Sequence, residues 1–184
     1  MSRKTVIRRP YLRWGMLALV QLGLIAVPLA DRLEVQLRGQ EVVLDLRPVD
    51  PRDLLRGDYV IINLALTQIS TDVPGAKDSW KAGDTVFVGL DTSGATAVPA
   101  NVTGTRADAG PLAISGVVVS AADDTVLRVD YGIDAFFLPE GEGKKVERLA
   151  ADRVHLVAAI GPKGRSVPLR LLVDGEEFKS DAAF

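Results

Sequence analysis

Residues 154–173 read VHLVAAIGPKGRSVPLRLLV, two apolar segments separated by a loop that contains glycine and proline. Val154–Ile160 and Val167–Val173 have the length of strands, and Gly161–Ser166 supplies turn residues between them. The stretch therefore predicts a β-hairpin. Its apolar and polar positions do not alternate cleanly, which favours one strand buried on both faces.

Short runs rich in valine and isoleucine recur on the N-terminal side of this hairpin, with Gly, Pro and Asp between them. Regular short strands separated by turn residues are typical of a β-sandwich or barrel. The further strands predicted are Glu34–Arg38, Glu41–Arg47, Tyr59–Ile69, Thr85–Leu90, Val98–Thr105, Ala113–Val119, Val126–Tyr131 and Ala135–Leu138. Helix is scarce in this part: we expect one short turn from Asp50 to Gly57 and a second short helix at Lys144–Asp152.

The N-terminal part of the chain has a different character. Trp14–Ala30, WGMLALVQLGLIAVPLA, carries no charge and one amide, Gln21. As a helix its 17 residues span roughly 25 Å, and Tyr11–Arg13 extend it toward the roughly 30 Å of a hydrocarbon core. The segment predicts a transmembrane anchor over residues 11–30, with the lipid bilayer as its partner.

Charge divides the chain at the same point. Residues 1–30 carry five basic side chains and no acid, whereas residues 31–184 carry 17 basic and 24 acidic side chains. The positive flank predicts a cytoplasmic N-terminal tail and an extracytoplasmic remainder. The acidic excess of the remainder would repel phosphate, so no nucleic-acid partner is expected. The predicted organisation is a basic tail at 1–10, an anchor at 11–30 and a β domain at 31–184.

Two other interpretations of the anchor stay open. A cleaved signal peptide needs small residues at the −3 and −1 positions, and cleavage after Ala30 would place Pro28 at −3. A buried core helix conflicts with the basic flank and with the lack of polar spacing. A retained anchor is favoured over both.

Residue types that carry common chemistry are few. The chain has no Cys and one His, His155, which disfavours a zinc site and predicts neither metal nor cofactor. We expect His155 to face solvent or a backbone carbonyl. The acids Asp45, Asp50, Asp53 and Asp58 lack the spacing of a calcium loop, so ion pairs and caps are their expected use. A membrane-anchored serine peptidase is disfavoured because no Ser lies between Ser2 and Ser70.

Residues 57–64, GDYVIINL, resemble the signature for which the GDYXXLXY family is named. The first three residues match, Ile62 stands for the signature Leu, and Leu64 stands for the signature Tyr. Residues 48–56 look like the family's lead-in. Residues 131–141, YGIDAFFLPEG, look like its second block. The resemblance covers nearly the whole chain.

This resemblance implies an architecture but no reaction. The family consists of bacterial membrane-anchored proteins of unknown biochemical function, so it implies a single-pass inner-membrane protein with a periplasmic β domain. It also implies a multi-spanning membrane protein as a partner, because such a protein is often encoded beside family members.

The two blocks predict a binding patch. On the expected strand, Tyr59 and Asn63 share one face and Leu64 lies on the other. If the blocks converge, a polar patch ringed by phenylalanine forms from Arg56, Gly57, Asp58, Tyr59, Phe136, Phe137 and Glu140. The competing interpretation is that both blocks serve the fold alone. No catalytic residue is assigned.

The favoured hypothesis is a non-enzymatic envelope protein whose β domain binds or regulates an integral membrane partner. The alternative is a hydrolase or transferase with carboxylate chemistry near Asp58 and Glu140. A third hypothesis is a ligand sensor, which would need a partner because the cytoplasmic tail is too short for a catalytic output.

Overall fold

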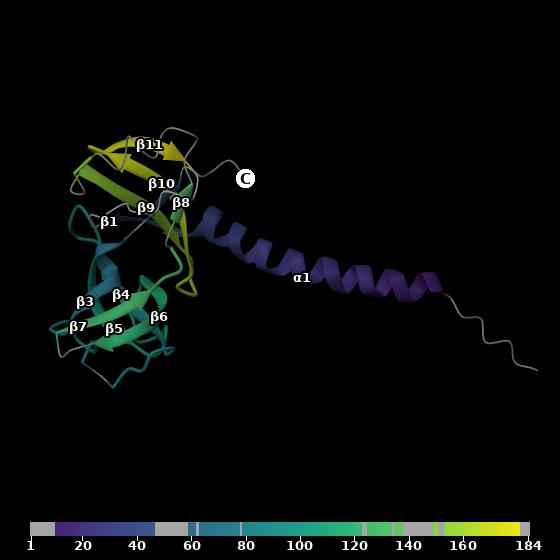
Figure 1. Ribbon diagram of the computed structural model, residues 1–184, viewed down its shortest axis with the longest axis horizontal. Coiled ribbons are helices and arrows are strands. Elements are labelled where there is room, and N and C mark those ends of the chain that lie inside the picture. The colour runs from purple at the N-terminus through teal and green to yellow at the C-terminus, as the bar shows by residue number, and fades with distance from the viewer. Residues whose placement is uncertain are drawn as a thin grey trace, which may run out of the picture. The chain divides into compact units, whose positions relative to one another are not determined.

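The computed structural model describes residues 10–46, 59–61, 63–77, 79–122, 125–133, 135–137, 149–150 and 153–180. Its chain divides into two compact units, Met1–Glu34 and Val35–Phe184, which are described separately. The expected helical turns at 50–57 and 144–152 lie wholly or almost wholly outside the described residues. Figure 1 shows one long helix and a body made of strands.

The first element, α1, runs from Pro10 to Arg38 and continues through Pro28. The prediction of a strand at Glu34–Arg38 is therefore wrong. A five-residue alternating run fits helix and strand equally well, and no Gly or Pro interrupts the chain between Pro28 and Gly39. The helix ends at Arg38, and the N–H of the following residue, Gly39, donates to the Val35 carbonyl at 2.8 Å.

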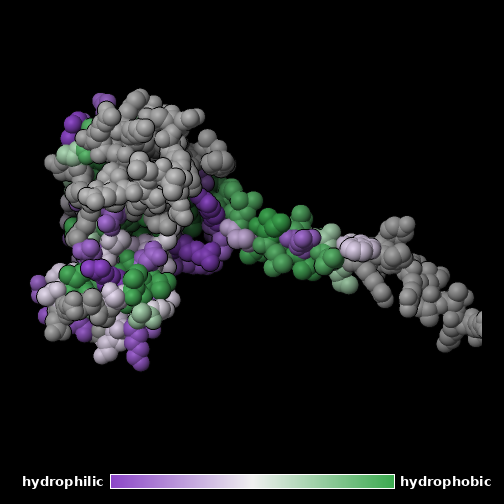
Figure 2. Space-filling model, viewed as in Figure 1, coloured by the Kyte–Doolittle hydropathy of each residue, from purple (hydrophilic) through white to green (hydrophobic). Residues whose placement is uncertain are grey.

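The apolar run of α1 is exposed all round the helix. Its stretch Trp14–Arg38 is long and apolar enough to cross a membrane, and none of the most apolar window is buried in the protein. Leucine, isoleucine and valine side chains are more than half exposed along most of it, as the green surface in Figure 2 shows. Exposure of this kind is costly in water and favourable in lipid.

Four antiparallel strands form the first sheet, in the order β1-β9-β10-β11. Their bounds are β1 Gln40–Asp45, β9 Val154–Ile160, β10 Ser166–Val173 and β11 Glu176–Ser180. The predicted hairpin is confirmed as β9–β10. The sequence analysis missed β11. Asp174 and Gly175 both have positive φ, as a tight two-residue hairpin turn requires, but the acidic strand after them lacks the usual β-formers.

Five antiparallel strands form the second sheet, in the order β3-β7-β6-β4-β5. Their bounds are β3 Gln68–Ser70, β4 Thr85–Asp91, β5 Val98–Thr103, β6 Ala113–Ala122 and β7 Val126–Asp130. The predicted single strand Tyr59–Ile69 is broken. It divides into β2 (Tyr59–Ile61), a 3-10 turn η1 (Ala65–Thr67) and the start of β3. A third, two-stranded sheet pairs β2 with β8 (Ala135–Phe137).

The two larger sheets share one core. Leu44, Leu156 and Leu171 of the first sheet belong to the same buried cluster as Ile114 and Leu127 of the second. The opposite face of the first sheet packs a smaller cluster of Val35, Val157, Ala159, Val167 and Leu169. Alternate residues of β9 enter different clusters, so the prediction of a strand buried on both faces is confirmed for β9. The mostly β fold with one apolar N-terminal helix agrees with the sequence analysis.

Candidate functional site

The structure brings the two family blocks together through their backbones. Strand β2 of the first block pairs antiparallel with β8 of the second, with Tyr59 opposite Phe137 and Val60 opposite Phe136. Segments about 75 residues apart in the chain are therefore neighbours. Arg56, Gly57, Asp58 and Glu140 lie outside the described residues, as do the side chains of Tyr59, Phe136 and Phe137. The full patch stays a prediction.

Tyr131, the first residue of the second block, forms another link between the blocks. Its hydroxyl donates a 3.0 Å hydrogen bond to the carbonyl of Leu66, two residues after the first block ends. The side chain is buried, and burial raises the pKa of Tyr131 above the ordinary value. The phenol therefore stays protonated and acts as a donor within the core. The sequence analysis did not single out this tyrosine, since its acceptor is a backbone atom that no motif marks.

The last position of the signature belongs to the core. Leu64 stands where the family has a tyrosine, and it is fully buried. It forms an isolated β-bridge with Leu46, just beyond the end of β1. Nearby, Thr67 Oγ1 donates to Asn63 Oδ1 at 3.2 Å and to the Leu64 carbonyl at 2.8 Å. In this chain the end of the signature therefore joins the ribbon of β2 and β8 to the main core, which is a structural role.

A second polar group lies on the first sheet. His155 Nε2 is 3.3 Å from Asp45 Oδ1, and Thr96 Oγ1 donates to Asp45 Oδ2 at 2.8 Å. The sequence analysis expected His155 to face solvent or a carbonyl, and its partner is instead a carboxylate that the strand register places opposite it. Asp45 therefore accepts a hydrogen bond from Thr96 through one oxygen and lies close to His155 through the other. A nucleophilic triad needs the hydroxyl to bond the histidine, so this group does not activate Thr96.

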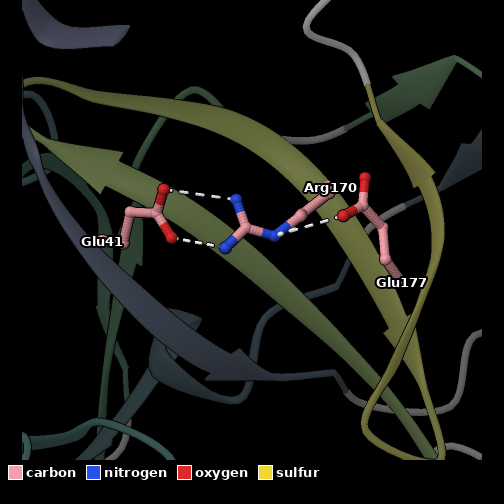
Figure 3. Close-up of polar contacts among 3 residues, drawn as sticks. All are labelled: Glu41, Arg170 and Glu177. Atoms are coloured by element: carbon pink, nitrogen blue, oxygen red, sulfur yellow. Dashed lines mark hydrogen bonds and ion pairs between the residues drawn. The ribbon is translucent and has the colours of Figure 1, made fainter. Parts of the chain in front are cut away.

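A chain of ion pairs crosses the same sheet (Figure 3). Arg170 of β10 donates to both carboxylate oxygens of Glu41 in β1, which lies on the far side of β9. Its Nε is 4.0 Å from Glu177 of β11. The hydrogen bond from Arg170 lowers the pKa of Glu41 below its usual range. These ion pairs tie the three strands together, and the lowered pKa of Glu41 keeps that carboxyl group ionised, which does not suit a general acid.

Among the described residues, no group of three or more His, Asp or Glu side chains is placed to hold a metal ion. The pairing of β2 with β8 is the feature that brings the two signature blocks together.

A family model described as GDYXXLXY protein matches residues 21–171, which include the second half of α1 and the strands from β1 into β10. No curated protein and no solved structure matches the chain.

Proposed function

Since the chain belongs to the GDYXXLXY protein family, we propose that it is a single-pass inner-membrane protein whose β unit is periplasmic and binds or regulates an integral membrane partner without catalysing a reaction. The observation that carries the proposal is α1, whose stretch Trp14–Arg38 is long and apolar enough to cross a membrane and whose most apolar window is not buried by the protein itself. The paired signature blocks of β2 and β8 provide the surface we assign to the partner.

The proposed orientation rests on charge. Arg3, Lys4, Arg8, Arg9 and Arg13 precede the apolar run, and no acid accompanies them. Positively charged flanks remain on the cytoplasmic side of a membrane.

Thiol labelling tests this orientation directly, because the chain has no cysteine of its own. Ser2→Cys reports on the tail, and Ser70→Cys reports on the exposed end of β3. In intact spheroplasts a membrane-impermeant thiol reagent is expected to label Ser70→Cys and to label Ser2→Cys only after lysis. The opposite pattern would overturn the orientation.

The partner is tested by photocrosslinking in membranes with the full-length chain. A photoreactive residue at Phe136 or Phe137 samples the two faces of β8, since adjacent residues of a strand point to opposite sides. The matched control is the same residue at Val119, an exposed position of β6 on the five-stranded sheet. We expect the photoreactive residue to crosslink one defined integral membrane protein from position 136 or 137 and not from position 119. Purification of that protein should in turn recover this chain. Failure to recover any integral membrane protein, under conditions that preserve known complexes, would contradict the proposal.

The alternative is carboxylate chemistry near Asp58 and Glu140. The pairing of Tyr59 with Phe137 supports it, because Asp58 precedes Tyr59 and Glu140 follows Phe137 by three residues. Paired carboxylates that share a reaction lie within roughly 10 Å of each other. An experimental structure that holds these carboxyl groups on unrelated faces would exclude this alternative.

A further inference from the structure

Gln21 is a polar side chain in the middle of the apolar run. It lies within one residue of the midpoint of Trp14–Ala30, and it is the only amide there, in a run without charges. The structure leaves it exposed on the surface of α1. At 3.6 residues per turn, its face of the helix also carries Trp14, Ala18 and Ile25, which lie seven and three residues before it and four residues after it. Ala18 and Ile25 have no polar side-chain atom, and Trp14, whose indole N–H is a donor, lies about 10 Å away along the helix axis.

An amide at this depth needs a partner. Its carbonyl and its NH₂ group bring acceptors and donors into hydrocarbon, where an unsatisfied polar group is costly. The backbone groups around it are already bonded within α1. Hydrogen bonds between helices satisfy such side chains in membranes.

We propose that Gln21 pairs with Gln21 of a second copy of this chain, so that two α1 helices associate in parallel within the bilayer; this inference rests on the proposed membrane anchor. A carboxamide is its own complement, because its N–H donates to the carbonyl oxygen of an identical group. A two-fold axis along the helices places identical residues opposite each other. One amide in an otherwise apolar run also sets a single register, as a lone polar residue does in a coiled coil.

The positions around Gln21 on α1 define which residues would lie in the interface between the two helices. Ala18, one turn before Gln21, is small and permits close approach of two helices, and Ile25 packs one turn after it. Leu19 and Ala26 lie one residue further along the chain, at nearly the same depth, but are rotated by about 100° about the helix axis. The proposed interface therefore contains positions 18 and 25 and excludes positions 19 and 26.

Disulfide crosslinking of the full-length chain in membranes tests this face. Four single-cysteine variants are compared: Ala18→Cys, Ile25→Cys, Leu19→Cys and Ala26→Cys. Because the natural chain has no Cys, any disulfide-linked dimer reports on the introduced residue. We expect oxidation to link the first two variants and not the last two. Equal linking of all four, or linking of the last two alone, would overturn the proposal.

The amide itself is tested by Gln21→Leu, with Gln21→Asn as the conservative variant. Energy transfer between labelled chains in detergent micelles measures the dissociation constant of the dimer. Gln21→Leu is expected to raise that constant by about three- to tenfold, and Gln21→Asn to change it less. An unchanged constant in Gln21→Leu would overturn the role of the amide.

Extraction of membranes at alkaline pH separates the two proposals. Chains that resist extraction yet show neither crosslinking nor energy transfer would overturn the dimer and leave the anchor intact. Chains that are extracted would overturn the anchor and the dimer with it.

Discussion

Gly116 in β6 has no room for a side chain. A Cβ at this position would lie 2.4 Å from Val129 Cγ1, 2.8 Å from the Asp130 carbonyl oxygen and 2.9 Å from Tyr131 Cδ1. We expect Gly116→Ala to lower the free energy of unfolding by about 1–3 kcal/mol, because the backbone oxygen cannot yield as a flexible side chain can. Denaturant unfolding of the detergent-solubilised chain measures the change.

Gly104→Ala is the matched control. Its Cβ would lie no closer than 3.7 Å to another atom, the tip of Trp80, which is an ordinary contact. A loss of stability as large in Gly104→Ala as in Gly116→Ala would show that steric crowding is not the cause.

Tyr131 makes stability depend on alkaline pH. Burial raises the pKa of Tyr131 above its ordinary value of 10.0. Above that pH the unfolded chain therefore loses this proton before the folded chain does, and stability that is present below pH 10 falls as pH rises. We expect the stability of Tyr131→Phe to fall less steeply with pH above pH 10. Near neutral pH we expect this variant to be less stable by about 1–3 kcal/mol, since the Leu66 carbonyl loses its donor. Thermal unfolding at several pH values measures both effects. If the stability of the variant and of the natural chain fell equally steeply above pH 10, the role of the Tyr131 proton would be contradicted.

At the scale of elements, the loop of the β9–β10 hairpin is hydrogen-bonded to the five-stranded sheet and to the loop before β6. Ser115 of β6 donates its N–H to the Gly164 carbonyl at 2.8 Å. Arg106 donates to the carbonyls of Pro162, Gly110 and Pro111 at 3.0, 2.6 and 2.8 Å. One guanidinium therefore joins the hairpin loop to the loop before β6.

Arg106→Met is expected to remove the side-chain hydrogen bond that holds the β9–β10 loop. The variant keeps the aliphatic stem and loses three donors, so we expect a loss of about 1 kcal/mol, reduced by the exposure of the site. Hydrogen exchange at the Ser115 amide should accelerate while exchange at the centre of β9 changes little. Arg128→Met, an exposed arginine of β7, is the control. Equal acceleration in the two variants would contradict the role of Arg106.

The bounds of the strands and of α1 show which elements local sequence could predict. Thr85–Leu90 and Val126–Tyr131 form strands with nearly the expected bounds. In the second of them, the buried residues Leu127 and Val129 alternate with exposed residues, which is the pattern of a half-buried strand. Glu34–Arg38 became helix because it continues an uninterrupted helix from the apolar run. Tyr59–Ile69 was divided because Leu64 joins the core through its bridge to Leu46, a contact that local sequence does not encode.

At the scale of the whole molecule, the apolar run should govern where the chain is found. An arginine at the centre of a membrane helix costs about 2.5–3.5 kcal/mol on insertion scales. We expect Leu22→Arg to increase the fraction of the chain that alkaline extraction releases from membranes. Leu22 is exposed on α1, so the change removes no packing within the protein.

Leu37→Arg is the control for this prediction. Leu37 is also exposed, but it lies seven residues beyond the apolar run, where an arginine can remain in water. Equal release of the two variants, or no release of either, would contradict an anchor centred on Leu22.

Composition and local pattern by themselves determined that this chain joins an apolar helix to a mostly β body, because hydropathy and β propensity act over short stretches. The two signature blocks likewise sufficed to predict the family. Only the tertiary structure decided that Tyr59 and Phe137 are paired, that Tyr131 bonds to Leu66 and that His155 meets Asp45. Each of these contacts joins segments far apart in the chain, and their pairing is set by how the sheets close over a shared core rather than by any local preference.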